Sequence, residues 1–377
     1  MIASIQWLSR LERETQPDFR IAAIDIRSTS YLNTWMDNFG YPELASIVPG
    51  STSGQHEQLR AAARKCPRFL FRVWSSASGG NKRLNTVDAI IPRAFLNGKG
   101  PTDISELFPG KLANLVSAHW SGEHVATVFS SWSQSLHYVL IWANSIASGS
   151  GRYSNVHISI IDTKRLPDSN PVFWTPALAR ISPGLPYCPW EFLAFGTISG
   201  PAHKAVKYDE LMELGISKLI DLTPLHLREP GLATSETVSI QEAITLVKRI
   251  SEQFGQDFAV PAAVYLLSCH DCHDTVDEQT AVNLFAEADI PQAWHDDPTI
   301  MIDDVFIGGF EDVQTAIALL RKLVENARGD GESVGMKRES DTPPTADLEL
   351  VEGQNAARKP RRMLKVMKDL DIDMVGW

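Results

Sequence analysis

A single carboxylate interrupts an apolar segment, and this feature limits what the chain can fold into more than any other. The segment reads Cys188-Pro189-Trp190-Glu191-Phe192-Leu193-Ala194-Phe195-Gly196, and apart from Glu191 its central part has the composition of a buried strand. An ionised carboxylate is costly to desolvate unless it is paired or hydrogen-bonded. Glu191 is therefore a salt-bridged residue, an edge residue facing solvent, or a working acid.

Two earlier segments also combine apolar strands with polar side chains. Leu70-Phe71-Arg72-Val73-Trp74 places one arginine in an apolar strand, and Phe129-Ser130-Ser131-Trp132-Ser133-Gln134-Ser135 places hydroxyls between a strand and a helix. The guanidinium of Arg72 suits bidentate binding of a phosphate, and its simpler interpretation is an ion pair with a carboxylate, Glu191 included. Ser131 and Ser133 have a simpler interpretation as helix-capping residues.

These three segments would supply one chemistry if they met in a cleft. Ser131 would hydrogen-bond a ribose, a nicotinamide or the carboxylate of Glu191. Glu191 would then stabilise positive charge on a ribose carbon while a glycosidic bond breaks, as carboxylates do in glycosidases. The residue types therefore suit cleavage of the nicotinamide–ribose bond of NAD.

Composition limits the class of protein. A chain of 377 residues holds one sizeable core with additions, or two domains, and a net charge of −11 argues against general nucleic-acid binding. The longest apolar run, from Phe258 to Cys269, contains Pro261 and is too short to span a bilayer. The N-terminus lacks the pattern of a secretory signal, so we expect an intracellular protein, cytoplasmic or nuclear and not secreted.

The pattern along the chain predicts an α+β fold in four parts. We expect an N-terminal extension over residues 1–60, a mixed domain over 61–225, a helical C-terminal subdomain over 226–327 and a disordered tail over 328–377. A long proline-rich connection is expected before the Glu191 strand. The predicted strands cover 69–74, 156–161 and 205–208, and the predicted helices cover 109–120, 135–146, 208–214, 277–288, 311–327 and a segment beginning at Ser239.

The order of these motifs resembles the Arg-Ser-Glu class of ADP-ribosyltransferases. More closely, Phe71-Arg72-Val73-Trp74, Phe129 to Leu136 and Glu191 to Gly196 resemble a fungal domain family of unknown function, over residues 67 to 215. The first resemblance implies an ADP-ribosyltransferase-like split-sheet core.

The ADP-ribosyltransferase resemblance also implies roles for single residues. Arg72 would anchor the phosphate and ribose of NAD, Ser131 would be the orienting serine, and Glu191 would be the catalytic glutamate. Ser133 and Trp132 would complete the NAD-binding set. Pro189 stands where arginine-modifying members often carry Glu or Gln, so NAD hydrolysis, transfer to another acceptor and no activity all stay open.

The leading hypothesis is an NAD-binding ADP-ribosyltransferase or NAD glycohydrolase, with NAD as its substrate and a protein acceptor as an optional partner. The alternative is a catalytically inactive interaction module on the same fold. Trp132, Trp174 and Trp190 either stack on a ring of NAD or pack in the core.

A second cluster, Cys269-His270-Asp271-Cys272-His273, has the spacing of covalent haem attachment or of half a zinc site. A zinc site would need further ligands, such as His295, Asp296 or Cys188. Otherwise these are ordinary residues, and no metal is assigned. The basic run from Arg358 to Arg362 resembles a nuclear-localisation patch or is an ordinary basic run in a tail.

Overall fold

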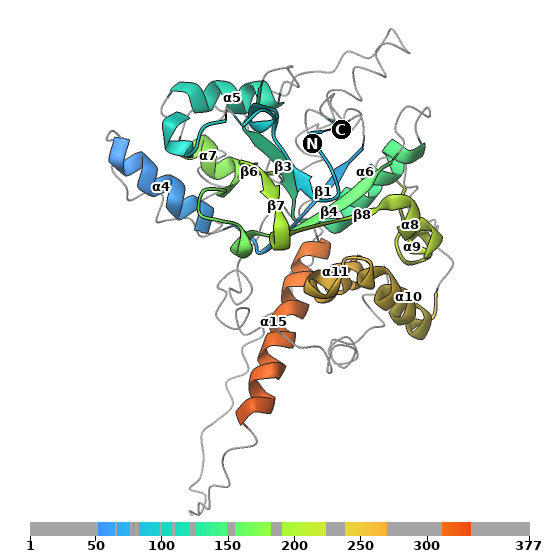
Figure 1. The fold of residues 1–377 in the computed structure, drawn as a ribbon. Helices are drawn as coiled ribbons and strands as arrows, with labels where there is room; N and C mark the ends of the chain where they lie inside the picture. Colours follow the sequence, from blue (N-terminus) through green and yellow to red (C-terminus); the bar gives the residue numbers. More distant parts are fainter. Residues whose placement is uncertain are drawn as a thin grey trace, which may run out of the picture.

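A six-stranded antiparallel sheet forms the centre of the fold (Figure 1). The structure is a computed structural model, and it describes residues 52–64, 66–75, 78, 83–98, 100–107, 110–120, 126–148, 155–181, 191–223, 238–269 and 311–332. The strand order is β5-β6-β3-β1-β4-β8. The strands are β1 (Phe69–Trp74), β3 (Phe129–Ser133), β4 (His157–Asp162), β5 (Val172–Trp174), β6 (Glu191–Phe195) and β8 (His203–Lys207).

Helices and short turns complete an α+β fold, as the sequence predicts. A second, two-stranded sheet joins β2 (Ala89–Ile90) to β7 (Ile198–Ser199). The described α-helices are α4 (Thr52–Arg64), α5 (Gly110–Trp120), α6 (Leu136–Ser148), α7 (Thr175–Ile181), α8 (Tyr208–Glu213), α9 (Ile216–Leu219), α10 (Ile240–Glu252), α11 (Gln256–Ser268) and α15 (Glu311–Glu332). Single 3₁₀ turns are η2 (Arg93–Phe95), η3 (Ile104–Leu107), η4 (Thr163–Arg165) and η5 (Gly200–Ala202).

The sheet is weakly joined at one place. β1 pairs with β4 at six positions and β3 pairs with β6 at five, but β1 and β3 pair only at Phe71 with Ser133. The sheet therefore consists of two well-paired halves, β5-β6-β3 and β1-β4-β8. We call their junction, formed by Phe71, Arg72, Ser131 and Ser133, the seam.

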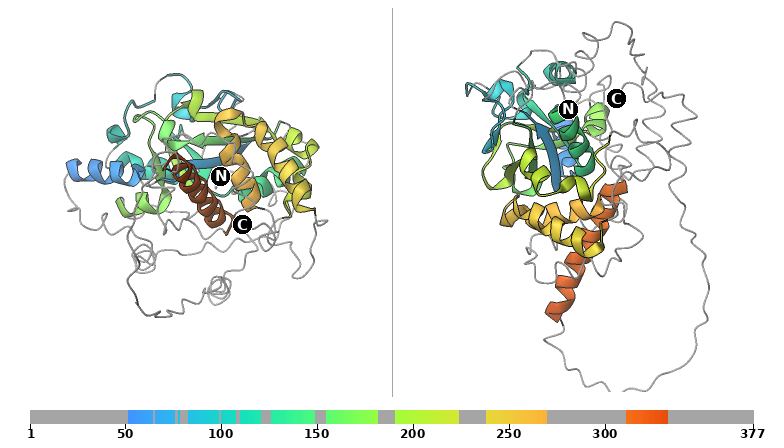
Figure 2. Two further views of the ribbon diagram at one scale, coloured as in Figure 1. Left: turned by 90° about the horizontal axis from the view of Figure 1, so that it is seen from below. Right: turned by 90° about the vertical axis from the view of Figure 1, so that its right-hand side faces the viewer.

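Two hydrophobic clusters pack against the sheet, and β1, β4 and β8 contribute different residues to each of them. One cluster joins β1, β4 and α6 to α10, α11 and α15, and the other surrounds β3, β5 and β6 together with α4, α5 and α7. In the right-hand view of Figure 2, α10, α11 and α15 lie together on one side of the sheet. The helices expected as a C-terminal subdomain therefore share a core with the sheet.

Local signals place several elements where the sequence predicts them. The Ser135 hydroxyl accepts a hydrogen bond from the Tyr138 amide at 3.0 Å and caps α6, and Ser239 caps α10 through the Glu242 amide at 3.3 Å. Such caps satisfy amides that have no partner within the helix. β1 has the predicted bounds, and α5, α6, β4, β8, α8, α10 and α15 confirm predicted elements to within five residues at their ends.

The prediction of one long connection before Glu191 was wrong in part. Residues 172–181 form β5 and α7, and all three β5 residues are buried. β5 pairs with β6, and tertiary burial of this kind overrides the turn signal of the flanking prolines. Likewise, Pro261 lies inside α11 without ending it, because the helix is buried along most of its length.

Several predictions lie outside the described residues. These are most of the N-terminal extension, the helix at 277–288, the tail beyond residue 332, the basic run from Arg358 to Arg362, and the end of the proline-rich connection with Trp190. α4 begins before the expected boundary at residue 60, and Leu59 and Ala62 place it in the second hydrophobic cluster.

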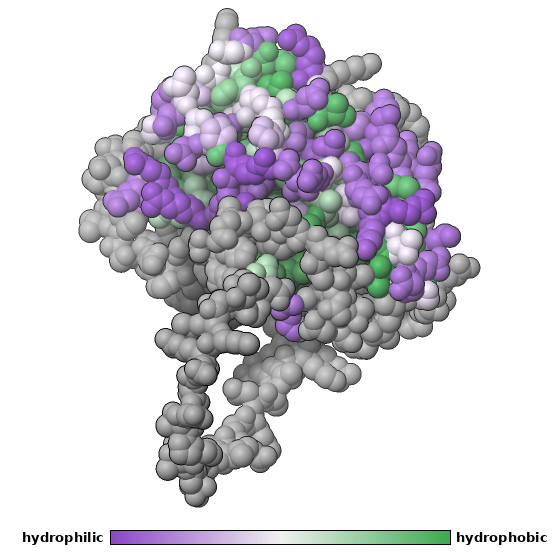
Figure 3. Space-filling model, turned by 60° about the horizontal axis from the view of Figure 1, so that its bottom comes forward, coloured by the Kyte–Doolittle hydropathy of each residue, from purple (hydrophilic) through white to green (hydrophobic). Residues whose placement is uncertain are grey.

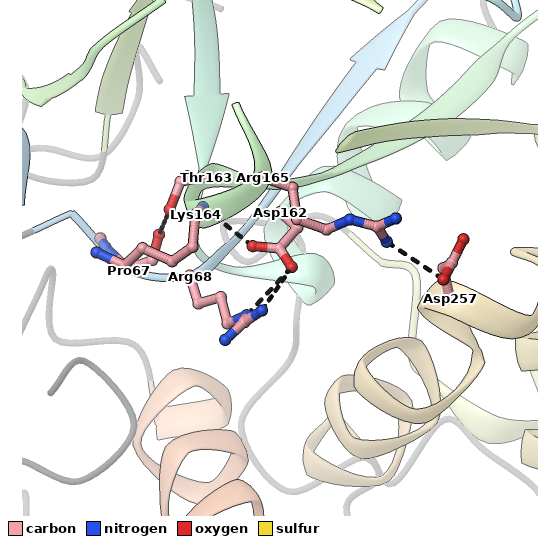
Figure 4. Close-up of polar contacts among 7 residues, drawn as sticks. All are labelled: Pro67, Arg68, Asp162, Thr163, Lys164, Arg165 and Asp257. Atoms are coloured by element: carbon pink, nitrogen blue, oxygen red, sulfur yellow. Dashed lines mark hydrogen bonds and ion pairs between the residues drawn. The ribbon is translucent and has the colours of Figure 1, made fainter. Parts of the chain in front are cut away.

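A buried ion pair ties the start of β1 to the end of β4 (Figure 4). Nε and Nη2 of Arg68 lie 3.1 and 2.9 Å from Oδ2 of Asp162, and both side chains are 5% exposed. The other carboxylate oxygen accepts from the Lys164 amide at 3.0 Å, and the Thr163 hydroxyl donates to the Pro67 carbonyl at 2.8 Å. These bonds fix the register of the β1–β4 pair from one end.

The described residues on the face shown in Figure 3 are mostly hydrophilic. On the face shown in Figure 3, smaller hydrophobic areas lie between polar ones. Among the described residues, Val87 is the one large hydrophobic side chain with high exposure. No described helix has the length and hydrophobicity that crossing a bilayer requires.

We predict that breaking the buried ion pair costs far more than breaking an exposed one. Arg68→Leu leaves the Asp162 carboxylate buried without its guanidinium, so we expect a loss of about 3–5 kcal/mol in the free energy of unfolding. Urea denaturation measures this quantity. The matched control is Arg165→Leu, whose ion pair with Asp257 is exposed, and its loss should stay below about 1 kcal/mol. Equal losses in the two variants would contradict the interpretation.

Candidate functional site

The seam collects the polar residues that the sequence singles out. The register aligns Phe71 with Ser133 and Ser133 with Glu191, so these three residues form one row across β1, β3 and β6. Arg72 is the next residue on β1, and Ser131 is two residues earlier on β3. Three segments that are distant in the sequence therefore meet at one point of the sheet.

Arg72 bridges the seam through its side chain. Its Nη1 donates to the main-chain carbonyl of Ser131 at 2.6 Å, which is a short hydrogen bond. The side chain is only partly exposed, and burial lowers the pKa of Arg72 to about 10 while the charge of Glu191 opposes that shift. Nε of Arg72 is buried and has no hydrogen-bond partner among the described residues. The Nε–H group of Arg72 is therefore still available to donate a hydrogen bond.

Glu191 and Ser133 lie opposite each other inside the sheet. Glu191 is 1% exposed and Ser133 is fully buried. The Ser133 hydroxyl accepts from the Ser135 amide at 3.2 Å, in the turn before α6. The capping interpretation of Ser131 and Ser133 was wrong, because both residues lie within β3 and Ser135 caps α6. In the part of the chain that the structure describes, Arg72 and Glu191 act on each other through their charges without a direct ion pair.

Ser131 bonds to a residue that the sequence analysis missed. Its hydroxyl lies 2.6 Å from Nε2 of His119 on α5, and Nδ1 of the same ring lies 3.1 Å from the hydroxyl of Thr127. Burial lowers the pKa of His119 well below its ordinary value, and the charge of Arg72 acts in the same direction. His119 is therefore a neutral imidazole at neutral pH. No local motif marks it, since α5 reads as an ordinary amphipathic helix.

The tryptophans pack in the core. Trp132 is fully buried, and its Nε1 donates to the Ser130 hydroxyl at 2.9 Å. Trp174 is 1% exposed in β5. The sequence analysis left two roles open for these tryptophans, which were packing in the core and stacking on a ring of NAD. Trp132 packs in the core, and its burial leaves no exposed ring face for a ligand.

A buried hydrogen bond connects the region of the seam to the C-terminal helix. The Ser135 hydroxyl donates to Oδ2 of Asp312 at 2.8 Å, and Asp312 is buried at the start of α15. Burial raises the pKa of Asp312, and the hydrogen bond from Ser135 opposes the shift. Ser135 therefore caps α6 and anchors α15 at once.

A small pocket lies away from the seam, at the edge strand β8. Its volume is about 280 Å³, and it is lined by Val87, Asp88, Gly200, His203, Lys204 and Ala205. His203 is held from behind, because its Nε2 lies 3.1 Å from the Ser159 hydroxyl, which also accepts from Nε1 of Trp74 at 2.8 Å. Burial lowers the pKa of His203 to about 4, although the backbone of Asp88 opposes the shift.

The metal alternative finds no support in the described residues. Within them, no three His, Cys, Asp or Glu side chains gather as metal ligands. Cys269 is buried at the end of α11. His270, Asp271, Cys272, His273, His295, Asp296 and Cys188 lie outside the described residues.

Comparison with known proteins matches the sheet region to a domain family whose function is unknown. A family model described as a domain of unknown function (DUF7587) matches residues 65–202, which is less than half of the chain. This stretch contains β1, β3, β6 and α5, and hence the whole seam. No curated protein and no solved structure matches the chain significantly.

We predict that His119 makes stability depend on pH below neutrality. Its folded-state pKa is lowered, so as pH falls through about 6.5 the unfolded chain takes up a proton that folded His119 does not. The free energy of unfolding should therefore fall more between pH 7 and pH 5 in the wild type than in His119→Gln, by about 1–2 kcal/mol. Urea denaturation at a series of pH values measures the difference. Parallel pH curves for the two proteins would refute the assignment.

Proposed function

We propose that the protein binds NAD at the seam and cleaves its nicotinamide–ribose bond, as an NAD glycohydrolase or an ADP-ribosyltransferase. The observation that carries this proposal is the meeting of Arg72, Ser131, Ser133 and Glu191 on three neighbouring strands. The order of these residues in the sequence did not by itself require them to lie close together in the fold. The ADP-ribosyltransferase-like fold is part of the same proposal, and the weak β1–β3 pairing supports its split-sheet character.

Arg72, Glu191 and Ser131 each have a distinct part in the proposed reaction. Arg72 offers Nε, which has no hydrogen-bond partner among the described residues, to a phosphate oxygen of NAD, while Nη1 holds the Ser131 carbonyl. Glu191 places a negative charge in a poorly solvated environment, where it acts strongly on the positive charge that develops at the ribose carbon. Ser131 contributes a hydroxyl from the neighbouring strand β3, two positions along the β3–β6 pair from Glu191.

The bond changes are those of a substitution at the ribose carbon. The bond from C1′ to the nicotinamide nitrogen breaks, and its electron pair leaves with nicotinamide. A lone pair of water, or of a protein acceptor, forms the new bond to C1′, and that nucleophile loses a proton. No oxidant or reductant is needed, so the chain requires no further redox partner.

Burial at the seam supports a second candidate function. Ser131 and Glu191 are almost fully buried, so NAD reaches them only if covering groups move. A catalytically inactive interaction module accounts for the same residues as an internal polar cluster that fixes the sheet. NAD binding is the property that separates the two candidates.

We expect wild-type protein to bind NAD in calorimetric titration and to release nicotinamide, measured by chromatography. Glu191→Gln keeps the shape of the side chain and removes the charge, so nicotinamide release should fall about 100-fold or more. Arg72→Ala should weaken NAD binding about 10- to 100-fold, because a charge-assisted hydrogen bond contributes about 1.5–3 kcal/mol.

The controls are matched in residue type and lie on exposed helix positions away from the seam. Glu213→Gln on α8 and Arg60→Ala on α4 should leave both measurements unchanged. Mass spectrometry of proteins incubated with NAD then separates transfer from hydrolysis. Absence of NAD binding by the folded wild-type protein would leave the interaction module as the better account.

A further inference from the structure

β8 lies at one edge of the six-stranded sheet, and no strand in the described part of the chain pairs with its outer side. The Tyr208 amide donates to the Val156 carbonyl at 2.9 Å, which marks a hydrogen-bonded pair of the antiparallel β4–β8 ladder. Bonded and non-bonded pairs alternate along such a ladder. The main-chain N–H and C=O groups of Ala205 and Lys207 therefore point away from β4, together with the carbonyl of His203. An outward row of this kind is a template for another strand.

The outer side of β8 is complementary to itself. If a two-fold axis passes beside Ala205, the Ala205 residues of two copies exchange a pair of main-chain hydrogen bonds. Each Lys207 amide then faces the His203 carbonyl of the other copy, which adds a second pair of bonds. The His203 amide takes no part, because it already donates to the Gly200 carbonyl. Antiparallel self-pairing of β8 therefore gives partners to most of its outward groups.

The same register keeps the lysines of β8 apart. Lysines on an edge strand usually hinder strand pairing. Around an axis at Ala205, Lys204 of one copy lies opposite Val206 of the other, and Lys207 lies opposite His203. Burial lowers the pKa of His203 to about 4, so its ring is uncharged at neutral pH and does not repel an ammonium group. Self-pairing therefore sets no like charges directly opposite each other.

The pocket beside β8 supplies a carboxylate for Lys207 of the second copy. Side chains of directly opposite residues lie on the same face of a sheet, and the His203 side chain lies on the face of the pocket. The pocket has a volume of about 280 Å³ and includes Asp88, whose negative charge acts on His203. A lysine side chain opposite His203 therefore meets both space and an opposite charge. By symmetry, the contact is made twice.

We propose that two copies of this chain form a dimer by antiparallel pairing of β8 with β8, in which Lys207 of each copy contacts Asp88 of the other. Lys207 leaves its present partner at little cost, because its contact with Glu210 is 3.6 Å long and both side chains are about half exposed. Strands of five residues bury an area at the low end for protein interfaces, so the dimer exchanges readily with the monomer. Pairing joins the sheets of the two copies into one.

The first experiment is analytical ultracentrifugation of the full chain over a concentration series. A salt concentration of about 0.15 M screens the repulsion between two chains of net charge −11. We expect the fraction of dimer to rise with concentration. Lys207→Glu should raise the dimer Kd about tenfold or more, because carboxylates then face each other at both contacts. The double variant Asp88→Lys with Lys207→Glu should restore the wild-type Kd.

The matched control is Lys204→Glu, which makes the same charge change on the same strand. Its side chain lies on the opposite face from Asp88, so the dimer Kd should change less than about threefold. Equal weakening by Lys204→Glu and Lys207→Glu, or failure of the double variant to restore the dimer, would overturn the proposal. A wild-type chain that stays monomeric at every concentration would also overturn it, and would leave the edge of β8 to an extended segment of another protein.

The second experiment tests the main-chain pairing itself. Lys207 has a φ of −75°, which proline adopts without strain, and its amide points away from β4. Lys207→Ala and Lys207→Pro both remove the ammonium group, but only Lys207→Pro removes the N–H. We expect the dimer Kd of Lys207→Pro to exceed that of Lys207→Ala about 10- to 30-fold, because two hydrogen bonds are lost per dimer. Thermal unfolding checks that both variants fold. Equal Kd values in two folded variants would show that the dimer uses another surface.

Discussion

The hydrogen bond from the Arg72 guanidinium to the Ser131 carbonyl joins two halves of a sheet that share one backbone pairing. A buried carbonyl without a donor costs free energy comparable to a lost hydrogen bond. The side chain thus supplies at the seam what the β1–β3 ladder does not. The same bond places a cation close to Glu191, which eases the burial of that carboxylate. The mutual position of β3 and β1, and hence of the seam residues, depends on it.

The ionisable side chains around this bond are either uncharged or bonded to a polar partner. His119 stays uncharged beside Arg72, because burial and the nearby guanidinium both disfavour its protonated form. Two residues beyond the seam, Ser135 holds the buried carboxylate of Asp312 at the start of α15. At the start of β1 and the end of β4, Arg68 and Asp162 form a buried ion pair. The polar groups of the interior are thus arranged in small, separate clusters along β1 and β3.

Local patterns predicted a good part of this structure. The apolar run of β1, the capping hydroxyl of Ser135 and the apolar face of α10 each depend on residues that lie close together in the sequence, so a short window of sequence contains them. β5, α7 and α11 were missed for the opposite reason. Prolines near or within these segments signal turns, yet burial against β6 and against α10 and α15 stabilises regular structure there. His119 was missed because a half-buried histidine on a helix has no local signature.

The sequence by itself determined which residue types stand in the apolar strands: one arginine in β1, spaced hydroxyls in β3 and one carboxylate at the start of β6. Their cost of desolvation already required partners. Only the tertiary structure decided which residues are the partners of these polar side chains. Arg72 bonds the Ser131 carbonyl instead of forming a direct ion pair with Glu191, and the Ser131 hydroxyl bonds His119. Strand register and helix packing bring together residues far apart in the chain, and no local spacing encodes that register.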